Sequence, residues 1–403
     1  MKNDLYVVGS GPGAPDLLTA LAAKIIGEAG CVVAAPRNSA LADGHGNILP
    51  LKDFAVTFEK IEEELKKGSV AVLVSGDPGM FSLLPLIKKK FDGANLKVIP
   101  GISSLQSLCC ATAESWEGAA ILSGHGRAVS AARLLMTADR NYRTFFFCGG
   151  RSSPKWVCKT LAENGLDALE VAVGERLSYP DQRISVGSPS SLSRRKFDTL
   201  SIALILNRTP WTPPFGRLKD EDFVRTDVPM TKSEVRSIIL DKLELTPDAV
   251  IWDLGAGTGS IAVSAALLCP EGEVYAVDSE PGAVELVHEN RKKFHCFNLS
   301  VFQGRCPAAM KKLPKPTHIF VGGNGGELRE ILLRAAALGK GIRVVVPAVS
   351  IQSMCVASEV MRKAGFSALD VTQLSVNKSK AVGNSKIMAA QNPVTIFSAL
   401  TNG

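Results

Sequence analysis

The chain has 403 residues, of which 46% are hydrophobic and 21% charged, and a formal net charge of +7. This length favours two ordinary domains, and the composition is that of a soluble α/β protein rather than a fibrous or disordered one. Its nine cysteines form no CxxC pair and have no paired histidine spacing. We therefore expect neither a disulfide framework nor a metal site.

Apolar runs are short throughout the chain. Phe145–Cys148 and Ile202–Leu206 fall far below the roughly 20 residues that span a bilayer, so no membrane segment is expected. The N-terminus leaves no room for the apolar core of a signal peptide, which predicts a cytoplasmic protein. Basic clusters lack interleaved aromatic residues and are interpreted as solvated faces, so no nucleic-acid partner is expected. These clusters are Lys88–Lys90, Arg194–Lys196 and Lys311–Lys312.

Short β-branched runs alternate with longer amphipathic segments, which predicts strands separated by helices in both halves. In the first half, strands are expected at Leu5–Val8, Cys31–Ala34, Val70–Ser75, Lys97–Ile99, Ala119–Leu122, Thr144–Phe147, Glu170–Val173 and Ser201–Leu206. In the second half, they are expected at Val250–Leu254, Glu273–Val277, Leu299–Phe302, His318–Val321, Ile342–Val346, Ser367–Val371 and Val394–Phe397. A proline-rich, charged stretch over 209–229 predicts a linker between domains 1–208 and 230–403.

Three glycine corners follow strands of the first half. They are VGSGPGAPDLLT at Val8–Thr19, SGDPGMFS at Ser75–Ser82 and PGISSLQ at Pro100–Gln106. The first resembles neither a dinucleotide loop nor a P-loop, because it holds prolines and no Lys-Ser/Thr pair follows. Open α/β sheets bind ligands at the carboxyl ends of their strands, so the corners predict one shared cleft.

These corners, with LSGHGR at Leu122–Arg127 and VGERLSYPDQRI at Val173–Ile184, resemble the tetrapyrrole methylase family in its precorrin C5-methylating branch, over residues 3–208. The resemblance implies a two-lobed fold, a homodimer formed through this half, and S-adenosylmethionine as cofactor. It implies cofactor contacts from Pro12, Ser75, Gly76, Asp77, Met80, Ser103, Ser104, Cys148 and Gly174. A lone histidine is usually structural, but flanking glycines at a strand end favour exposure. His125 and Arg127 are therefore candidates to meet substrate carboxylates.

The second half carries WDLGAGTGSIA at Trp252–Ala262, an apolar strand that ends in a glycine loop and leads into a helix. Its GxGxG spacing differs from the GxGxxG of dinucleotide binders and favours a ligand with a carboxylate facing the helix N-terminus. The methionine end of S-adenosylmethionine is such a ligand. Asp278 ends the next strand, where a carboxylate can accept hydrogen bonds from ribose hydroxyls. The alternative is that Asp278 only caps a helix.

Four segments around this loop are similar to the precorrin C15-methyltransferase/decarboxylase family over residues 225–400. They are VPMTKSEVRS, VDSEPGAVELVHEN, GRCPAAM and IFVGGNGGEL. The resemblance implies a Rossmann-like class I methyltransferase fold whose cofactor is lined by Thr231, Gly255, Ala256, Gly257, Thr258, Gly259, Asp278, Gly304 and Cys306. It implies a substrate cleft faced or shaped by Lys232, Glu234, Arg236, Gly322 and Gly323. An alternative for Thr231 and Glu234 is a simple N-cap with a capping box, TKSE.

This half departs from its family at four polar positions, which hold Ser264, Thr317, Pro347 and Gln352. If one of the family's residues there moves a proton or promotes decarboxylation, that step is affected. Together the two resemblances imply methylation of a precorrin at carbons 5 and 15, with decarboxylation of the ring C acetate, on the route to cobalamin. We expect Lys232, Arg236 and Arg305 to hold the remaining carboxylates.

Two other functions stay open. Both folds also occur in RNA methyltransferases, and the net charge of +7 permits RNA binding. Strong, steeply salt-dependent RNA binding would favour that alternative. The second is a protein that binds S-adenosylmethionine without catalysis, which tight cofactor binding without turnover of any precorrin would favour.

Overall fold

The computed structural model describes residues 3–126, 128–214 and 216–403. The chain divides into two compact units, Met1–Trp211 and Thr212–Gly403. The strands predicted from the sequence are all present, each with bounds within five residues of the predicted ones at either end. Four short strands were not predicted, namely β3, β9, β17 and β18. Among the described residues, no helix has the length and apolar character that crossing a membrane requires.

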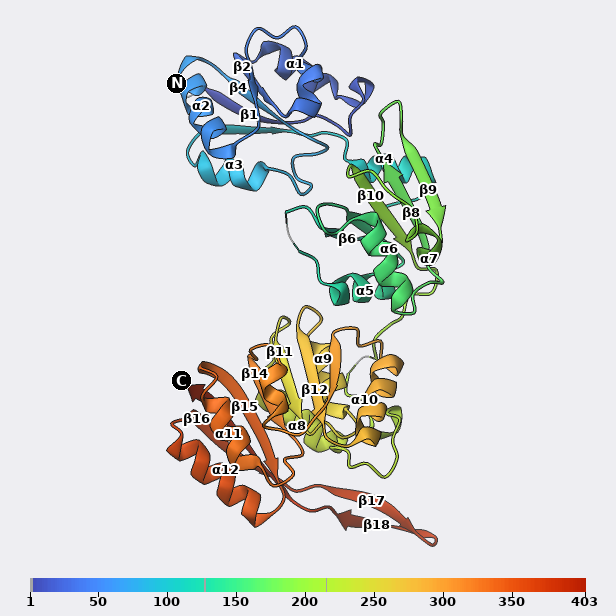
Figure 1. Ribbon diagram of the computed structural model, residues 1–403, viewed down its shortest axis with the longest axis vertical. Helices are drawn as coiled ribbons and strands as arrows, with labels where there is room; N and C mark the ends of the chain where they lie inside the picture. The colour runs from blue at the N-terminus through green and yellow to red at the C-terminus, as the bar shows by residue number, and fades with distance from the viewer. Residues whose placement is uncertain (1–2, 127, 215) are drawn as a thin grey trace. The chain divides into compact units, whose positions relative to one another are not determined.

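The first lobe of unit 1 is a parallel sheet with strand order β3-β2-β4-β1-β5. The central strand β4 is buried along its whole length and reads VAVLV, the apolar run expected where helices cover both faces. Helix α1 packs on one face, and α2 and α3 on the other (Figure 1). The elements are β1 (Asp4–Gly9), α1 (Ala20–Glu28), β2 (Cys31–Ala34), the 3₁₀ helix η2 (Pro36–Ala42), β3 (Ile48–Pro50), α2 (Phe54–Lys67), β4 (Val70–Val74), α3 (Leu84–Lys90) and β5 (Asn95–Ile99).

The second lobe of unit 1 is a mixed sheet with strand order β6-β7-β10-β8-β9. Only β6 and β7 pair in parallel, and the other neighbours are antiparallel. The elements are α4 (Ser104–Thr112), β6 (Ala120–Ser123), α5 (Ala131–Arg140), β7 (Arg143–Phe147), α6 (Pro154–Glu163), β8 (Glu170–Glu175), β9 (Arg183–Gly187), α7 (Pro189–Leu192) and β10 (Ser201–Leu206). The expected α/β architecture of this half, with two lobes, is confirmed.

Unit 2 is one seven-stranded sheet with order β13-β12-β11-β14-β15-β19-β16. Its first five strands are parallel, while β19 runs antiparallel between β15 and β16. Helices α11 and α12 pack on one face, and α8, α9 and α10 on the other. This confirms the expected Rossmann-like architecture.

The elements of unit 2 are the 3₁₀ helix η3 (Asp220–Asp222), α8 (Ser233–Leu243), β11 (Val250–Leu254), α9 (Ser260–Leu268), β12 (Glu273–Asp278), α10 (Pro281–Lys293), β13 (Leu299–Gln303), β14 (His318–Val321), α11 (Leu328–Ala336), β15 (Lys340–Ala348), α12 (Ile351–Lys363), β16 (Ser367–Leu374), β17 (Asn377–Val382), β18 (Ser385–Ala390) and β19 (Val394–Asn402). Strands β17 and β18 form a separate two-stranded hairpin (Figure 1).

Part of the stretch with linker composition packs against unit 2. Leu218 and Phe223 are buried in a core cluster with β11, β12 and α9. The backbone N–H of Val224 donates to the Asn290 side chain at 2.8 Å. Two apolar anchors in an otherwise polar segment are thus enough to fix residues 218–224 on unit 2.

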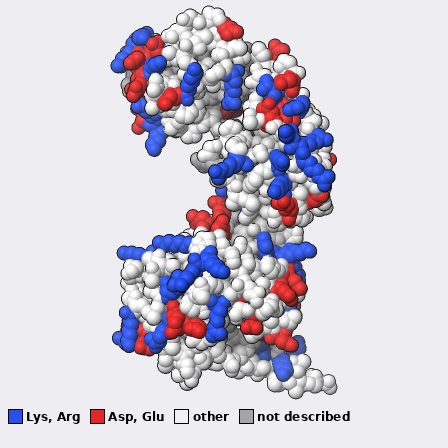
Figure 2. Space-filling model, viewed as in Figure 1, with Lys and Arg blue, Asp and Glu red and all other residues white. Residues whose placement is uncertain are grey.

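The visible surface carries mixed charges. Lys and Arg side chains are interspersed with Asp and Glu on the face seen in Figure 2. Within the basic cluster Lys88–Lys90, which forms the last turn of α3, Lys90 pairs with Glu62 at 3.0 Å.

Candidate active sites

The three glycine corners of unit 1 meet at the carboxyl edge of its first sheet. A Cβ on Gly9 would lie 2.6 Å from the Gly101 nitrogen, and one on Gly101 would overlap the Gly76 carbonyl oxygen. Gly76 donates from its backbone to the Gly11 oxygen at 2.8 Å. Because the corners contact one another through backbone, glycine is required where they touch. The convergence expected from the sequence is therefore present.

Asp77 ties two of these corners together. One carboxylate oxygen accepts from the Gly79 N–H at 2.7 Å, and the other accepts from the Gly101 N–H at 3.1 Å. Beside the third corner, Ser103 is buried and caps α4 with a capping box that includes Gln106. The carboxylate of Asp77 thus fixes backbone geometry at the floor of the site.

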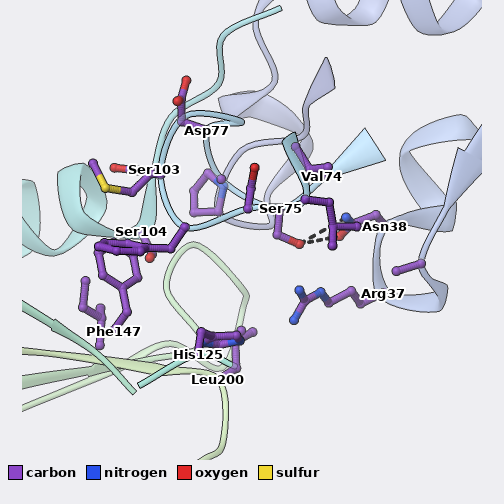
Figure 3. A pocket seen from close by; sticks show the side chains of 18 of the residues that line it. Arg37, Asn38, Val74, Ser75, Asp77, Ser103, Ser104, His125, Phe147 and Leu200 are labelled. Carbon is purple, nitrogen blue, oxygen red and sulfur yellow. Dashed lines mark hydrogen bonds between the residues drawn. The ribbon is translucent and has the colours of Figure 1, made fainter. Parts of the chain in front are cut away.

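A cavity of about 650 Å³ lies in front of these corners. It is lined by every residue of unit 1 predicted to contact the cofactor, namely Pro12, Ser75, Gly76, Asp77, Met80, Ser103, Ser104, Cys148 and Gly174. His125 lines it as well, from the loop after β6 (Figure 3). Arg127 lies outside the described residues. Residues predicted from separate motifs are thus gathered in one place.

Several cavity residues escaped the sequence analysis. Asn38 is buried, and its Nδ2 donates to the Ser75 hydroxyl at 3.2 Å (Figure 3). Arg37 and Lys52 follow β2 and β3, and Phe81 lies within the second corner. The available signal was that β2 is another parallel strand ending at the same edge, but no glycine follows it. Asn38, Arg37 and Lys52 follow these strands without forming a recognisable sequence motif, so they were not predicted as site residues.

The Cys148 thiol is a wall of the cavity rather than a reactive group. Its side chain is buried, and burial raises the pKa of this thiol to about 12. A thiol with so high a pKa stays protonated and is neither a nucleophile nor a base at neutral pH.

The glycine loop of unit 2 joins three strands. Gly255 and Ala256 donate their N–H groups to the Val277 oxygen at 2.8 and 3.1 Å. A Cβ on Gly255 would overlap the Gly323 carbonyl oxygen, and one on Gly257 would lie 2.7 Å from the Pro229 oxygen. All three glycines of the motif have positive φ, between 56° and 75°. This backbone suits glycine, and it brings β11, β12 and β14 together at their carboxyl ends.

Asp278 lies at the end of β12 and is half-buried. One of its oxygens accepts from the Gly257 N–H at 2.8 Å, and the other accepts from the Glu280 N–H at 3.0 Å. The helix-cap alternative is thus partly right, because Glu280 is the N-cap residue directly before α10. Each carboxylate oxygen still has a lone pair that can accept from another donor. Asp278 can therefore hold the loop and bind ribose hydroxyls at the same time.

Asp253 is a titratable group next to the loop that the sequence analysis missed. It is 1% exposed in β11 and accepts from the Ala262 N–H at 2.9 Å. Burial raises the pKa of this carboxyl to about 7, with a smaller contribution from the charge of Asp278. An aspartate within an apolar strand does not reveal from sequence whether its side chain is buried. The burial of Asp253 was therefore not predicted.

The role predicted for Arg236 is contradicted. Its side chain is 1% exposed and donates to the carbonyl oxygens of Leu218 at 2.6 Å and Thr231 at 2.8 Å. It also pairs with Asp220 at 3.4 Å and lies over the Phe223 ring. The guanidinium anchors residues 218–223 on α8 and is not available to a substrate carboxylate.

The start of α8 differs from the capping-box alternative. The N-cap is Lys232, without a side-chain cap, so the TKSE box is not formed. Glu234 instead pairs with Lys378 at 2.9 Å and Arg217 at 3.7 Å. Lys232 is exposed. Thr231 precedes the helix and is half-buried.

Arg305 and its neighbours join two loops at the same edge of the sheet. Gly304 donates to the Asp278 backbone oxygen at 2.8 Å. The Arg305 guanidinium donates to the Gly325 oxygen at 3.2 Å and the Glu327 carboxylate at 3.3 Å. Cys306 is half-buried against the core beside β14, and burial raises its thiol pKa to about 11. Arg305 thus holds the glycine-rich loop after β14 as the structure stands.

The four departures from the family pattern occupy different places. The Ser264 hydroxyl lies inside α9 and donates to the Ser260 oxygen at 2.7 Å. Thr317 precedes β14, and its hydroxyl accepts from the Val250 N–H at 2.9 Å. Pro347 lies near the carboxyl end of β15, and Gln352 is exposed in the first turn of α12.

Comparison with known families covers both units. Residues 4–192 match the family described as tetrapyrrole (corrin/porphyrin) methylases. Residues 222–401 match the family described as precorrin methyltransferase domain. The two matches together span most of the chain and follow its division into units.

Two relatives and one solved structure show the extent of the similarity. A probable cobalt-precorrin-6B C(15)-methyltransferase (decarboxylating) of Pyrobaculum calidifontis is 41% identical over 193 residues, 47% of this chain and 98% of the relative. A precorrin-6Y C(5,15)-methyltransferase (decarboxylating) of Sinorhizobium sp. is 26% identical over 356 residues, 86% of this chain and 84% of the relative. A crystal structure of precorrin-6y C5,15-methyltransferase from Geobacter metallireducens GS-15 is 31% identical, with a TM-score of 0.44, over 47% of this chain and 100% of that chain.

Proposed function

Since the chain belongs to the precorrin methyltransferase family, we propose that it methylates a precorrin-6-level corrinoid at carbons 5 and 15 with S-adenosylmethionine. In the same proposal it removes the carboxyl group of the ring C acetate as carbon dioxide, which leaves a methyl group, as a precorrin-6Y C(5,15)-methyltransferase of cobalamin biosynthesis does. We assign carbon 5 to unit 1, and carbon 15 with the decarboxylation to unit 2.

One observation carries this proposal: a single chain holds two glycine-built sites on two different folds. Each site lies at the carboxyl edge of a parallel sheet, where open α/β folds bind ligands. Two sites of different architecture suit two methylations at different carbons of one substrate. The Sinorhizobium relative, which also covers both units, carries both positions in its name.

The residues present fit S-adenosylmethionine in both units. In unit 2, the glycine loop leads into the N-terminus of α9, and Asp278 keeps lone pairs for ribose hydroxyls. The positive end of that helix suits a carboxylate. In unit 1, the cavity has the size of a small-ligand site and is bordered by the glycine corners and Ser103. When bound, the cofactor supplies an activated methyl group on its sulfonium.

The side chains of unit 1 position the reactants and exclude water. A bridging carbon of a reduced tetrapyrrole is itself the nucleophile, so the protein supplies none, in keeping with the protonated Cys148. The rings of Phe81 and Phe147 pack together, with their centroids 5.3 Å apart, and both line the cavity. Alignment in a dry site accounts for much of the acceleration of such a transfer. His125 is the cavity imidazole that we propose takes the proton released after transfer.

In unit 2, substrate carboxylates are assigned to Lys232, because Arg236 is buried and Arg305 already binds Glu327. When the carboxyl group of the ring C acetate leaves as carbon dioxide, the electron pair of the broken carbon–carbon bond passes into the protonated ring system. The remaining carbon takes up a proton and becomes a methyl group. A cation that holds a neighbouring carboxylate fixes the ring while carbon dioxide departs. Lys232 at the exposed start of α8 is placed for that role.

The experiment is mass spectrometry of products from a precorrin-6-level substrate, metal-free and cobalt-loaded in parallel, with methyl-labelled S-adenosylmethionine. We expect a gain of two methyl groups and a loss of carbon dioxide. Asp278→Asn should abolish methylation at carbon 15 and the decarboxylation, and should leave methylation at carbon 5. The matched control is Asp241→Asn on the exposed side of α8. No methyl transfer to either substrate would contradict the proposal, and steeply salt-dependent RNA binding would then favour the RNA methyltransferase alternative.

A cytoplasmic location and a homodimer through unit 1 stay predictions. Light scattering of the full chain and of unit 1 would test the dimer. A monomer at micromolar concentration would contradict it.

A further inference from the structure

Two cations border the cavity of unit 1 without an ionic partner. Arg37 is the second residue of η2, and Lys52 follows β3; both are exposed and both line the cavity. Within the described part of the chain, neither forms an ion pair. Figure 3 shows Arg37 reaching from η2 toward the interior, with His125 on the far side of the cavity.

Two acids, one next to Lys52 in the chain and one lining the same cavity, accept hydrogen bonds from backbone N–H groups. Asp53 follows Lys52, but its carboxylate caps α2 by accepting from the Ala55 and Val56 N–H groups. Asp77, the acid among the described residues lining the cavity, accepts from two backbone N–H groups. Among the described residues, neither carboxylate forms an ion pair with Arg37 or Lys52. Both cations can therefore bind an anionic ligand at this rim of the cavity.

Exposed aromatic rings lie at the same rim. Phe54 is 44% and Phe81 is 53% exposed, and both line the cavity. Phe81 has a φ of 49°, a left-handed conformation that is an outlier for a bulky side chain and that clusters at ligand sites. An exposed apolar surface within a concave site marks a binding surface.

We propose that Arg37 and Lys52 bind peripheral carboxylates of the tetrapyrrole, while Phe54 and Phe81 contact the face of its ring. This contact selects which edge of the macrocycle enters the cavity of unit 1. The proposal rests on the proposed function and names the residues that recognise the substrate there. A tetrapyrrole is a flat apolar ring with carboxylates at its edge. Its ring can pack on the two phenylalanine side chains while its carboxylates pair with the two cations.

The first test is equilibrium binding, which needs no turnover. The full chain is titrated into uroporphyrin, a polycarboxylate porphyrin, and its fluorescence is followed. Because each variant loses a charged hydrogen bond to a porphyrin carboxylate, Arg37→Gln and Lys52→Gln should each weaken binding by about tenfold. Arg37→Lys should recover part of the loss, because it keeps the charge but not the guanidinium fork.

The matched controls are variants that remove one positive charge at a position outside the cavity. Lys89→Gln on α3 and Arg194→Gln after α7 concern exposed cations that do not line the cavity. An equal loss of porphyrin binding in these controls would overturn the proposal in favour of a bulk charge effect. Unchanged binding in Arg37→Gln and Lys52→Gln would overturn it too.

The second test separates substrate from cofactor recognition. In turnover, KM for the corrinoid in methylation at carbon 5 should rise about tenfold in both variants, while calorimetric binding of S-adenosylhomocysteine and methylation at carbon 15 stay unchanged. Weaker S-adenosylhomocysteine binding would overturn the proposal and assign the cations to the cofactor. If the unmodified chain binds porphyrin through Arg37 but methylates no carbon 5, the proposed function fails and the anion-binding role stands.

Discussion

Asp253 gives unit 2 a pH dependence that can be calculated from its burial. Its pKa rises from 3.8 to about 7, chiefly because the side chain is buried. The folded protein therefore keeps a proton that the unfolded chain releases above about pH 4. Between those pKa values the native state binds more protons, so the free energy of unfolding falls as the pH rises. Stability from this group is complete below about pH 4 and is lost as the pH passes through 7.

The size of the effect follows from the two pKa values. Each unit of difference between the folded and the unfolded pKa is worth about 1.4 kcal/mol. Between pH 5 and pH 8, unit 2 should lose roughly 2 to 3 kcal/mol through Asp253 alone. In Asp253→Asn this contribution vanishes, because an amide does not titrate. The Asn oxygen can still accept from the Ala262 N–H.

The assay is urea unfolding of the full chain at several pH values, followed by tryptophan fluorescence. Trp252 is the tryptophan of unit 2 and is buried next to Asp253. The quantity of interest is the difference in unfolding free energy between wild type and Asp253→Asn, which cancels all other titrating groups. Asp241→Asn serves as the exposed acid-to-amide control. A difference that stays constant within about 0.5 kcal/mol from pH 5 to pH 8 would refute the reasoning.

Three further predictions concern packing and positioning. Gly101→Ala should push the corner away from the Gly76 oxygen at a cost of about 1 to 3 kcal/mol, so that calorimetry with S-adenosylhomocysteine finds one site instead of two. Asn38→Ala should weaken binding at that site about fivefold, because the Ser75 hydroxyl loses a hydrogen bond worth about 1 kcal/mol. Arg236→Ala should lower the unfolding free energy of unit 2 by about 3 to 5 kcal/mol, measured by urea unfolding.

Each of these predictions has an outcome that contradicts it. Gly27→Ala adds a Cβ to open space in α1, so two binding sites in that variant and also in Gly101→Ala would refute the steric argument. Unchanged affinity in Asn38→Ala would show that Ser75 needs no support. If Arg236→Ala raised KM for the corrinoid without loss of stability, the original assignment of Arg236 to substrate would return.

The glycine motifs were predictable because their requirement is local. Positive φ at Gly255, Gly257 and Gly259, and backbone contact at Gly76 and Gly101, leave glycine as the residue that fits. A strand followed by glycines then places the loop at the carboxyl edge without knowledge of the rest of the fold. The positions of both sites and their sheets could be read in this way.

Other site features depended on distant parts of the chain. Arg236 is of a residue type that often binds substrate carboxylates. Its guanidinium instead donates a hydrogen bond to the carbonyl oxygen of Leu218, 18 residues earlier in the chain. Asn38 and Arg37 follow a strand without a glycine motif. The strands β17 and β18 contain Asn, Lys, Ser and Ala, which have low β propensity. For Arg236 and Asn38, contacts with distant residues decided the outcome. The hairpin of β17 and β18 instead rests on the pairing of its two strands with each other.

The position of the four family departures limits what they can change. Thr317 precedes the four-residue strand β14, whereas the site lies beyond its carboxyl end at Gly322. At about 3.3 Å per residue, Thr317 and Gly322 are separated by roughly 16 Å, and the Thr317 hydroxyl is hydrogen-bonded to Val250 of β11. Thr317 thus supports the sheet and cannot replace an acid that acts on the substrate. Gln352 instead lies exposed after the carboxyl end of β15, at the catalytic edge of the sheet. An effect of the departures on decarboxylation is therefore expected from Ser264, in the helix that follows the glycine loop, or from the segment that holds Pro347 and Gln352, but not from Thr317.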